Sequence, residues 1–135
     1  MPGLGKILVV DDEQGFRDLY QCFLEPIGFD VDTACNGLEA VELARKNDYD
    51  LIFLDVHMPL MSGPEAFEQI LAHRQDQKVL ITSSSTDSSS DFETSALEQG
   101  AVGCLRKPSD LDAVMQVLIR ELGCPKNPGI GFAYK

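Results

Sequence analysis

The sequence has no tryptophan, few basic residues and no long apolar run. Its 11 lysines and arginines stand against 22 aspartates and glutamates, which gives a net charge of -11. Such an acidic chain argues against direct contact with nucleic acid or an anionic membrane, because both need basic patches. No apolar stretch approaches the roughly 20 residues that span a bilayer, and the first residues lack the layout of a signal peptide. We therefore expect no membrane partner and no nucleic-acid contact from this chain.

The four cysteines lack the close spacing of metal or redox motifs. Cys22, Cys35, Cys104 and Cys124 are scattered, and none belongs to a Cys-x-x-Cys pair. Scattered cysteines are typical of reduced thiols, so together with the missing signal peptide they predict a cytoplasmic protein. Hydrophobic residues make up 44% of the 135 residues and charged residues 24%, as expected of a globular domain with a single core.

Short apolar runs alternate with segments of helical periodicity along the chain. Runs rich in Val, Ile and Leu predict strands, and apolar residues spaced three or four apart predict helices. The predicted strands are residues 6–10, 29–35, 50–55, 78–83 and 102–107. The predicted helices are residues 13–27, a helix after Gly37 carrying Leu38, Val41 and Ala44, one that opens at 62–65, a short one from 90 to 100, and one from Ser109 to Gly123.

Strands that alternate with helices form a parallel sheet covered on both faces. The pattern therefore predicts an α/β fold, a doubly wound five-stranded parallel sheet with five helices. We expect residues 1–123 to form this domain. Residues 124–135 contain two prolines and two glycines and little periodicity, so they are predicted to be a tail or the start of a linker.

A carboxylate ends one of the most apolar strands, in the stretch LIFLDVHMPLMSG. Asp55 follows four apolar residues, and a buried carboxylate without compensation is costly. In parallel sheets the ligand site lies beyond the carboxyl ends of the strands. We therefore expect Asp55 to lie at that edge and to be reachable from solvent.

Other polar residues end the neighbouring strands. Asp11, Asp12 and Glu13 follow the first strand. Thr82 and Ser83 end the fourth strand and Lys107 ends the fifth. Crowded carboxylates repel one another, and such hard oxygen ligands suit Mg²⁺. Each residue also has an ordinary structural explanation, as a helix cap, a turn residue or a solvated loop. Their combination at one sheet edge favours a site for phosphoryl transfer, with Asp55 as nucleophile and Lys107 paired with either a carboxylate or a bound anion.

The motifs KILVVDDE, LIFLDVHMPLMSG, the TS of KVLITSSS, and LRKP resemble, in this order, the receiver domain of two-component response regulators, the CheY-like family. The resemblance runs from about Lys6 to Gly123. It implies a flavodoxin-like sheet with strand order 2-1-3-4-5. It also implies that Asp55 accepts a phosphoryl group from a histidine kinase or phosphotransfer protein.

The same resemblance assigns the remaining site residues. It implies that Asp11 and Asp12 hold Mg²⁺ together with Asp55 and the backbone carbonyl of His57. It implies that Ser83 and Lys107 contact the phosphoryl oxygens. Receiver domains catalyse only their own phosphorylation and dephosphorylation, so no turnover of a metabolite is expected. The pathway and the downstream effector stay open, as does a homodimer.

The sequence departs from the family pattern at two places. The family usually carries Tyr or Phe three residues before the lysine, where this chain has Cys104, so the aromatic part of the usual switch is in doubt. The serine-rich stretch after Ser83 makes the segment up to Lys107 about two residues longer than usual, and its composition is typical of a flexible loop.

Two other functions remain open from the sequence. Phosphatases of the haloacid dehalogenase type also use a strand-end aspartate and Mg²⁺, but they carry a second acid where this chain has His57. Turnover of a generic phosphate ester would distinguish them. A degenerate receiver that only binds partners is the other alternative, and the intact set of acids, serine and lysine argues against it.

Overall fold

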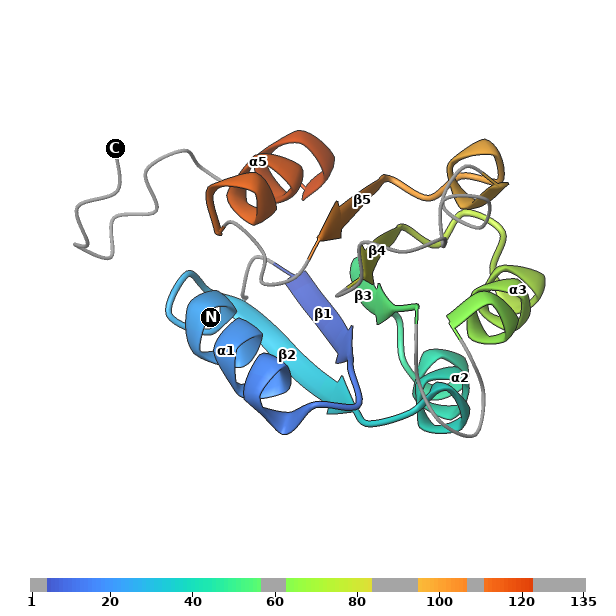
Figure 1. Cartoon of the computed structure of the whole chain (residues 1–135), viewed down its shortest axis with the longest axis horizontal. Helices are drawn as coiled ribbons and strands as arrows, with labels where there is room; N and C mark the ends of the chain where they lie inside the picture. Colours follow the sequence, from blue (N-terminus) through green and yellow to red (C-terminus); the bar gives the residue numbers. More distant parts are fainter. Residues whose placement is uncertain (1–4, 57–62, 84–94, 107–110, 123–135) are drawn as a thin grey trace.

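The protein, seen in a computed structural model, forms a five-stranded sheet with helices on both faces (Figure 1). The structure describes residues 5–56, 63–83, 95–106 and 111–122. The strands are β1 (Gly5–Val10), β2 (Phe29–Ala34), β3 (Leu51–Asp55), β4 (Val79–Ser83) and β5 (Gly103–Arg106). The helices are α1 (Gln14–Leu24), α2 (Gly37–Lys46), α3 (Gly63–His73) and α5 (Leu111–Leu122), and residues 95–98 are helical as well.

All strand pairs are parallel, and the strand order is β2-β1-β3-β4-β5. This confirms the predicted fold class and strand order. The order reverses between β1 and β3, because the chain first adds β2 on one side of β1 and then crosses to the other side. The carboxyl ends of β1 and β3 therefore border the position where doubly wound folds bind their ligands.

The core has two halves, one on each face of the sheet. Alternate residues of a strand point to opposite faces, so Ile7 and Val9 pack towards α1 and α5, whereas Leu8 and Val10 pack towards α2 and α3. The central strand β3 is buried along its whole length. Its Phe53 meets the ring of Tyr20 edge to face at 5.2 Å.

Helix α1 ends earlier than the sequence predicts. The expected helix ran over residues 13–27, whereas α1 stops at Leu24. Pro26 has no backbone N–H, so the regular helical ladder cannot continue through it. The chain closes instead with two tighter turn bonds, from Ile27 N–H to the Leu24 carbonyl and from Gly28 N–H to the Glu25 carbonyl.

Helix α2 begins with a reciprocal cap. The side chain of Asn36 accepts a hydrogen bond from Glu39 N–H at 2.8 Å, and the Glu39 carboxylate accepts one from Cys35 N–H at 2.9 Å. Val41 is buried as its spacing predicts, but Leu38 is 47% exposed. Leu38 is only the second residue of the helix, so its position in the apolar repeat does not bring it against the sheet.

A polar cluster lies at the opposite, amino end of the sheet. The hydroxyl of Tyr49, which is 3% exposed, donates to Asp32 Oδ2 at 2.7 Å. Lys6 Nζ lies 3.8 Å from the same carboxylate oxygen and donates to Asn47 Oδ1. Burial raises the pKa of Tyr49 well above its usual range, and the hydrogen bond to Asp32 and the negative charge of Asp32 raise it further. A hydrogen bond with Asn47 lowers this pKa by a smaller amount.

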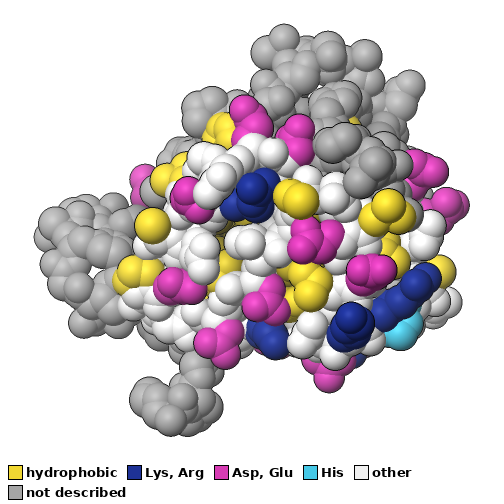
Figure 2. All heavy atoms as spheres, turned by 90° about the horizontal axis from the view of Figure 1, so that it is seen from below, with side chains coloured by type: hydrophobic (Ala, Val, Ile, Leu, Met, Phe, Trp, Pro, Cys, Tyr) yellow, Lys and Arg dark blue, Asp and Glu magenta, His cyan; other side chains and the backbone are white. Residues whose placement is uncertain are grey.

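The surface of the described residues is mainly acidic. Figure 2 shows Asp and Glu side chains spread over one face, with basic side chains between them. Among the described residues, no helix is both long and apolar enough to cross a membrane.

Candidate functional site at the carboxyl edge of the sheet

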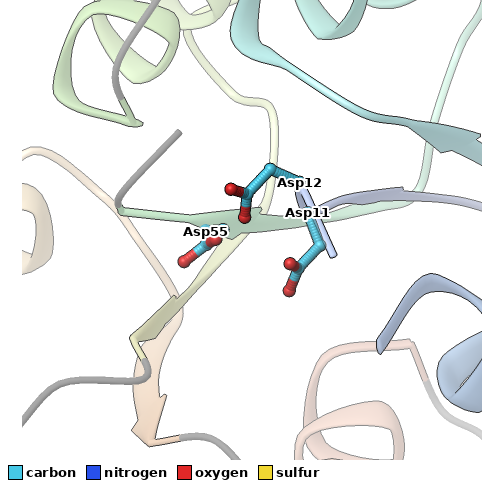
Figure 3. Close-up of side chains that lie close together, drawn as sticks. All are labelled: Asp11, Asp12 and Asp55. Carbon is cyan, nitrogen blue, oxygen red and sulfur yellow. The ribbon is translucent and has the colours of Figure 1, made fainter. Parts of the chain in front are cut away.

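Three aspartates lie together where β1 and β3 end (Figure 3). Asp11 and Asp12 follow β1, and Asp55 is the last residue of β3. The two strands are neighbours, and their register pairs Val10 with Leu54, so Asp11 and Asp55 take the next position on each strand. One carboxylate oxygen from each of the three aspartates lies within 4.8 Å of the others. The sequence prediction that these acids meet at one edge is therefore correct.

The three aspartates differ in burial. Asp11 is 1% exposed and Asp55 is 2% exposed, whereas Asp12 is exposed. The expectation that Asp55 is reachable from solvent is wrong for this structure. Asp55 still belongs to the ladder between β3 and β4, where it pairs with Thr82, and the backbone bond from Val56 N–H to the Thr82 carbonyl continues beyond it. The backbone of Asp55 is therefore still part of the sheet on the β4 side and not yet part of a loop.

Asp11 is held by hydrogen bonds at its amide, its carbonyl and its side chain. Its backbone N–H donates to the carbonyl of Ala34 at 3.1 Å, which ties it to the end of β2. Its Oδ1 accepts from Glu13 N–H at 2.9 Å. Its carbonyl oxygen accepts from Nη1 of Arg17 at 2.6 Å.

These contacts bear on the alternative explanation, in which the acidic pair only caps a helix. The N-cap residue of α1 is Glu13, whose side chain makes no cap hydrogen bond. Asp11 shapes the turn before the helix through its bond to Glu13 N–H, so it does have a local structural role. That role does not explain why Asp12 and Asp55 share its surroundings.

The donor set fits Mg²⁺. Mg²⁺ prefers oxygen ligands at about 2.1 Å, keeps several waters and usually takes few protein carboxylates. Opposite ligands of such an ion lie about 4.2 Å apart, which is twice the bond length. Three ligands of an octahedral ion include at most one opposite pair, and the other pairs lie about 3.0 Å apart. The carboxylate oxygens lie within 4.8 Å of one another, so the three side chains would close in around the ion or some would bind it through a water.

The other predicted site residues are only partly described. Ser83 is the last residue of β4 and pairs with Arg106 of β5, so its backbone lies one position beyond Thr82, the partner of Asp55. The side chain of Ser83 lies outside the described part of the structure, as do His57 and Lys107. The roles of Ser83, His57 and Lys107 therefore stay predictions.

Cys104 lies in β5, where the related domains usually carry an aromatic residue. It is partly buried and packs against the half of the core under α2 and α3. The position is therefore filled by a small side chain that faces the interior, not by an exposed one.

Arg17 was not among the site residues predicted from the sequence. The signal was available in retrospect, because α1 has no acidic residue in its first turn and places this cation near its positive end, where the helix dipole disfavours it. A helical side chain also leans towards the N-terminus of its helix, so Arg17 can reach back to the turn that precedes α1.

The comparisons with known proteins agree with this geometry. Residues 7–119 match the response regulator receiver domain. The chain therefore belongs to this family, whose members are phosphorylation-controlled signalling domains of two-component systems. The match begins within β1 and covers β2 to β5 completely, together with both strand ends that carry the aspartates.

Relatives of known sequence and structure support the same assignment. The chain is 35% identical to a transcriptional regulatory protein, the CpxR homolog of Haemophilus influenzae, over 92% of this chain and 54% of the relative. It is 34% identical to the transcriptional regulatory protein SrrA of Staphylococcus aureus, over 83% of this chain and 46% of the relative. The chain thus spans about half the length of these two relatives. The chemotaxis protein CheY4 of Vibrio cholerae superposes with a TM-score of 0.76 at 30% identity, over 87% of this chain and 98% of that protein.

Proposed function

We propose that Asp55 accepts a phosphoryl group in a Mg²⁺-dependent reaction and that this modification controls the domain. The observation that carries the proposal is the convergence of three carboxylates from β1 and β3 in a chain of the receiver family. Asp55 is the residue of the three that ends the central strand, and it is almost completely buried. Its carboxylate can act as a nucleophile that few waters reach.

The proposed reaction moves one phosphoryl group from its donor to Asp55. An oxygen of the Asp55 carboxylate forms a bond to phosphorus while the bond from phosphorus to the donor breaks. Asp11 and Asp12 would hold Mg²⁺ beside Asp55, together with the backbone carbonyl of His57. When bound, Mg²⁺ supplies positive charge that offsets the charge of the phosphoryl oxygens. Ser83 and Lys107 would contact those oxygens by a hydroxyl and an ammonium group.

The partner that fits this chemistry is a phosphohistidine protein, either a histidine kinase or a phosphotransfer protein. We propose that the domain comprises residues 1–123, works in the cytoplasm and turns over no metabolite. The transcriptional regulators to which it is similar suggest an effector that acts on gene expression, through a partner or a further domain.

The assignment of Asp55 can be tested with a small-molecule donor. The chain is incubated with acetyl phosphate, or with beryllofluoride, in the presence of Mg²⁺, and adducts are located by mass spectrometry. One adduct per chain at Asp55 is expected, and Asp55→Asn should abolish it. Asp30→Asn is a matched control, because Asp30 is exposed and lies in β2 opposite Lys6, near the other end of the sheet. An adduct that persists in Asp55→Asn would overturn the assignment.

The same preparation separates the proposal from the phosphatase alternative. A receiver should undergo one modification and then lose the phosphoryl group slowly, without turning over a generic phosphate ester. Sustained release of phosphate from such an ester, dependent on Asp55 and Mg²⁺, would favour the phosphatase.

A further inference from the structure

Arg17 stands out among the described residues because its charged side chain is directed at the backbone of the acidic cluster. It lies in α1, is partly buried, and donates from Nη1 to the Asp11 carbonyl at 2.6 Å. This distance is typical of a short, charge-assisted hydrogen bond. The placement is unfavourable with respect to the helix dipole, so the contact has to compensate for it.

We propose that Arg17 is a positioning residue for the Mg²⁺ site and thereby for phosphorylation of Asp55. This inference rests on the proposed function, because it concerns the same acidic cluster. It assigns to Arg17 the placement of Asp12, the exposed member of the cluster, and not a contact with the metal or the phosphoryl group.

The planar peptide bond explains how this works. The Asp11 carbonyl belongs to the peptide unit that joins Asp11 to Asp12, and the atoms of that unit lie in one plane. Holding the carbonyl oxygen therefore fixes the direction in which the chain enters Asp12. The amide of Asp11 is already tied to Ala34 and its side chain to Glu13, so the bond to Arg17 fixes the remaining freedom of this turn.

Charge and position predict opposite effects of removing Arg17. If only its charge mattered, its loss would make the cluster more negative and would tighten Mg²⁺ binding. If its hydrogen bond positions Asp12, its loss lets the Asp11–Asp12 peptide rotate and weakens binding. Residues that orient metal ligands typically cost about 10- to 100-fold in affinity when they are lost, so the positional effect should prevail.

The experiment measures Mg²⁺ affinity by isothermal titration calorimetry in the parent and in Arg17→Met, Arg17→Lys and Arg45→Met. Calorimetry suits a chain without tryptophan, which offers no strong intrinsic fluorescence. Arg45 is an exposed arginine in the last turn of α2, at the end of that helix remote from the acidic edge, so Arg45→Met controls for the loss of one positive charge.

The Kd of Arg17→Met should rise about tenfold, while that of Arg45→Met stays within about twofold of the parent. Arg17→Lys keeps the charge but has a shorter side chain, so its Kd should be intermediate between those of the parent and Arg17→Met. Amide exchange of Glu13 N–H, which bonds to Asp11, should be faster in metal-free Arg17→Met and unchanged in Arg45→Met.

The outcomes separate this inference from the proposed function. Equal or tighter Mg²⁺ binding by Arg17→Met, in a parent that binds Mg²⁺ and is phosphorylated at Asp55, would overturn the role of Arg17 alone. A parent that binds no Mg²⁺ would overturn both. If thermal melts show that Arg17→Met does not fold, Arg17→Lys decides, because a Kd equal to or below that of the parent would overturn the predicted intermediate value and with it the positioning role of the guanidinium.

Discussion

The acidic cluster should cost the metal-free protein stability, and replacing Asp55 by asparagine measures this cost. Asparagine has nearly the same shape as aspartate, so Asp55→Asn removes one charge from the cluster without opening a cavity. Two carboxylate oxygens within 4.8 Å of each other repel by at least about 3.5 kcal/mol at an effective dielectric constant of 20 and by at least about 0.9 kcal/mol in bulk water. Asp55 and Asp11 are buried whereas Asp12 is exposed, so one of the two pairs that include Asp55 lies nearer the higher estimate.

Nearby cations such as Lys107 would offset part of this repulsion. We therefore expect metal-free Asp55→Asn to be more stable than the parent by about 1–2 kcal/mol. For a domain of this size each kcal/mol raises Tm by about 3–5 °C. Mg²⁺ binds the folded cluster and not the dispersed unfolded chain, so it should stabilise the parent by about 1.4 kcal/mol at ten times Kd. Asp55→Asn should respond less, because it has lost one ligand.

The assay is a set of thermal melts of the parent, Asp55→Asn and Asp30→Asn, in Mg²⁺ and in NaCl of equal ionic strength. Asp30→Asn corrects for the general benefit of removing one negative charge from a chain with a net charge of -11. If metal-free Asp55→Asn is no more stable than Asp30→Asn, the repulsion argument is wrong. If the parent gains no more from Mg²⁺ than from NaCl, the acidic cluster does not bind this metal.

Two further predictions concern the amino end of the sheet. Burial and the bond to Asp32 raise the pKa of Tyr49 above its unfolded value. The contribution of Tyr49 to the stability of the fold is therefore complete below about pH 10 and is lost as the pH rises further. Tyr49→Phe, which loses the 2.7 Å hydrogen bond, should be less stable by about 1 kcal/mol at neutral pH, and urea melts should show this gap narrowing above pH 10; a constant gap would contradict the coupling. Gly5→Ala should destabilise by about 1–3 kcal/mol in the same melts, because Gly5 has a φ of 151° and a Cβ there would lie 2.7 Å from Asp50 Oδ2; an Ala variant as stable as the parent would show that this strand end can shift.

The sheet could be predicted from the sequence because each strand carries its own signal. Runs such as Ile7 to Val10 are apolar on both faces, and only a sheet covered on both sides buries them completely. The failures lie where local pattern and three-dimensional context differ. The spacing of apolar residues predicted that the first helix continues past Pro26, whose missing N–H ends the helical hydrogen bonding. The same spacing included Leu38 in the apolar repeat, but this second residue of α2 is exposed.

The site shows a similar division. The aspartates could be placed at one edge because parallel strands end on the same side, and the register of β1 and β3 puts Asp11 beside Asp55. Their unequal burial could not be predicted, because a strand-end pattern does not show which side chains are covered by the surrounding segments; Asp11 and Asp55 are buried whereas Asp12 is exposed. Arg17 was not predicted because its partner is a backbone carbonyl. The sequence shows only a cation near the start of a helix that has no acidic residue in its first turn, and it does not show which group this cation bonds to.

These observations together explain why a buried aspartate ends the central strand. Burial of Asp55 would limit water around the proposed nucleophile, but its charge then needs compensation by nearby groups. Arg17 does not bond to a carboxylate of the cluster, because its Nη1 donates to the backbone carbonyl of Asp11. The three acids lie close enough to repel, so we expect the metal-free protein to be less stable than its Asp55→Asn variant. Binding of Mg²⁺ should relieve this repulsion and stabilise the folded protein. Asp55→Asn and Arg17→Met should therefore both reduce the gain in Tm that Mg²⁺ gives.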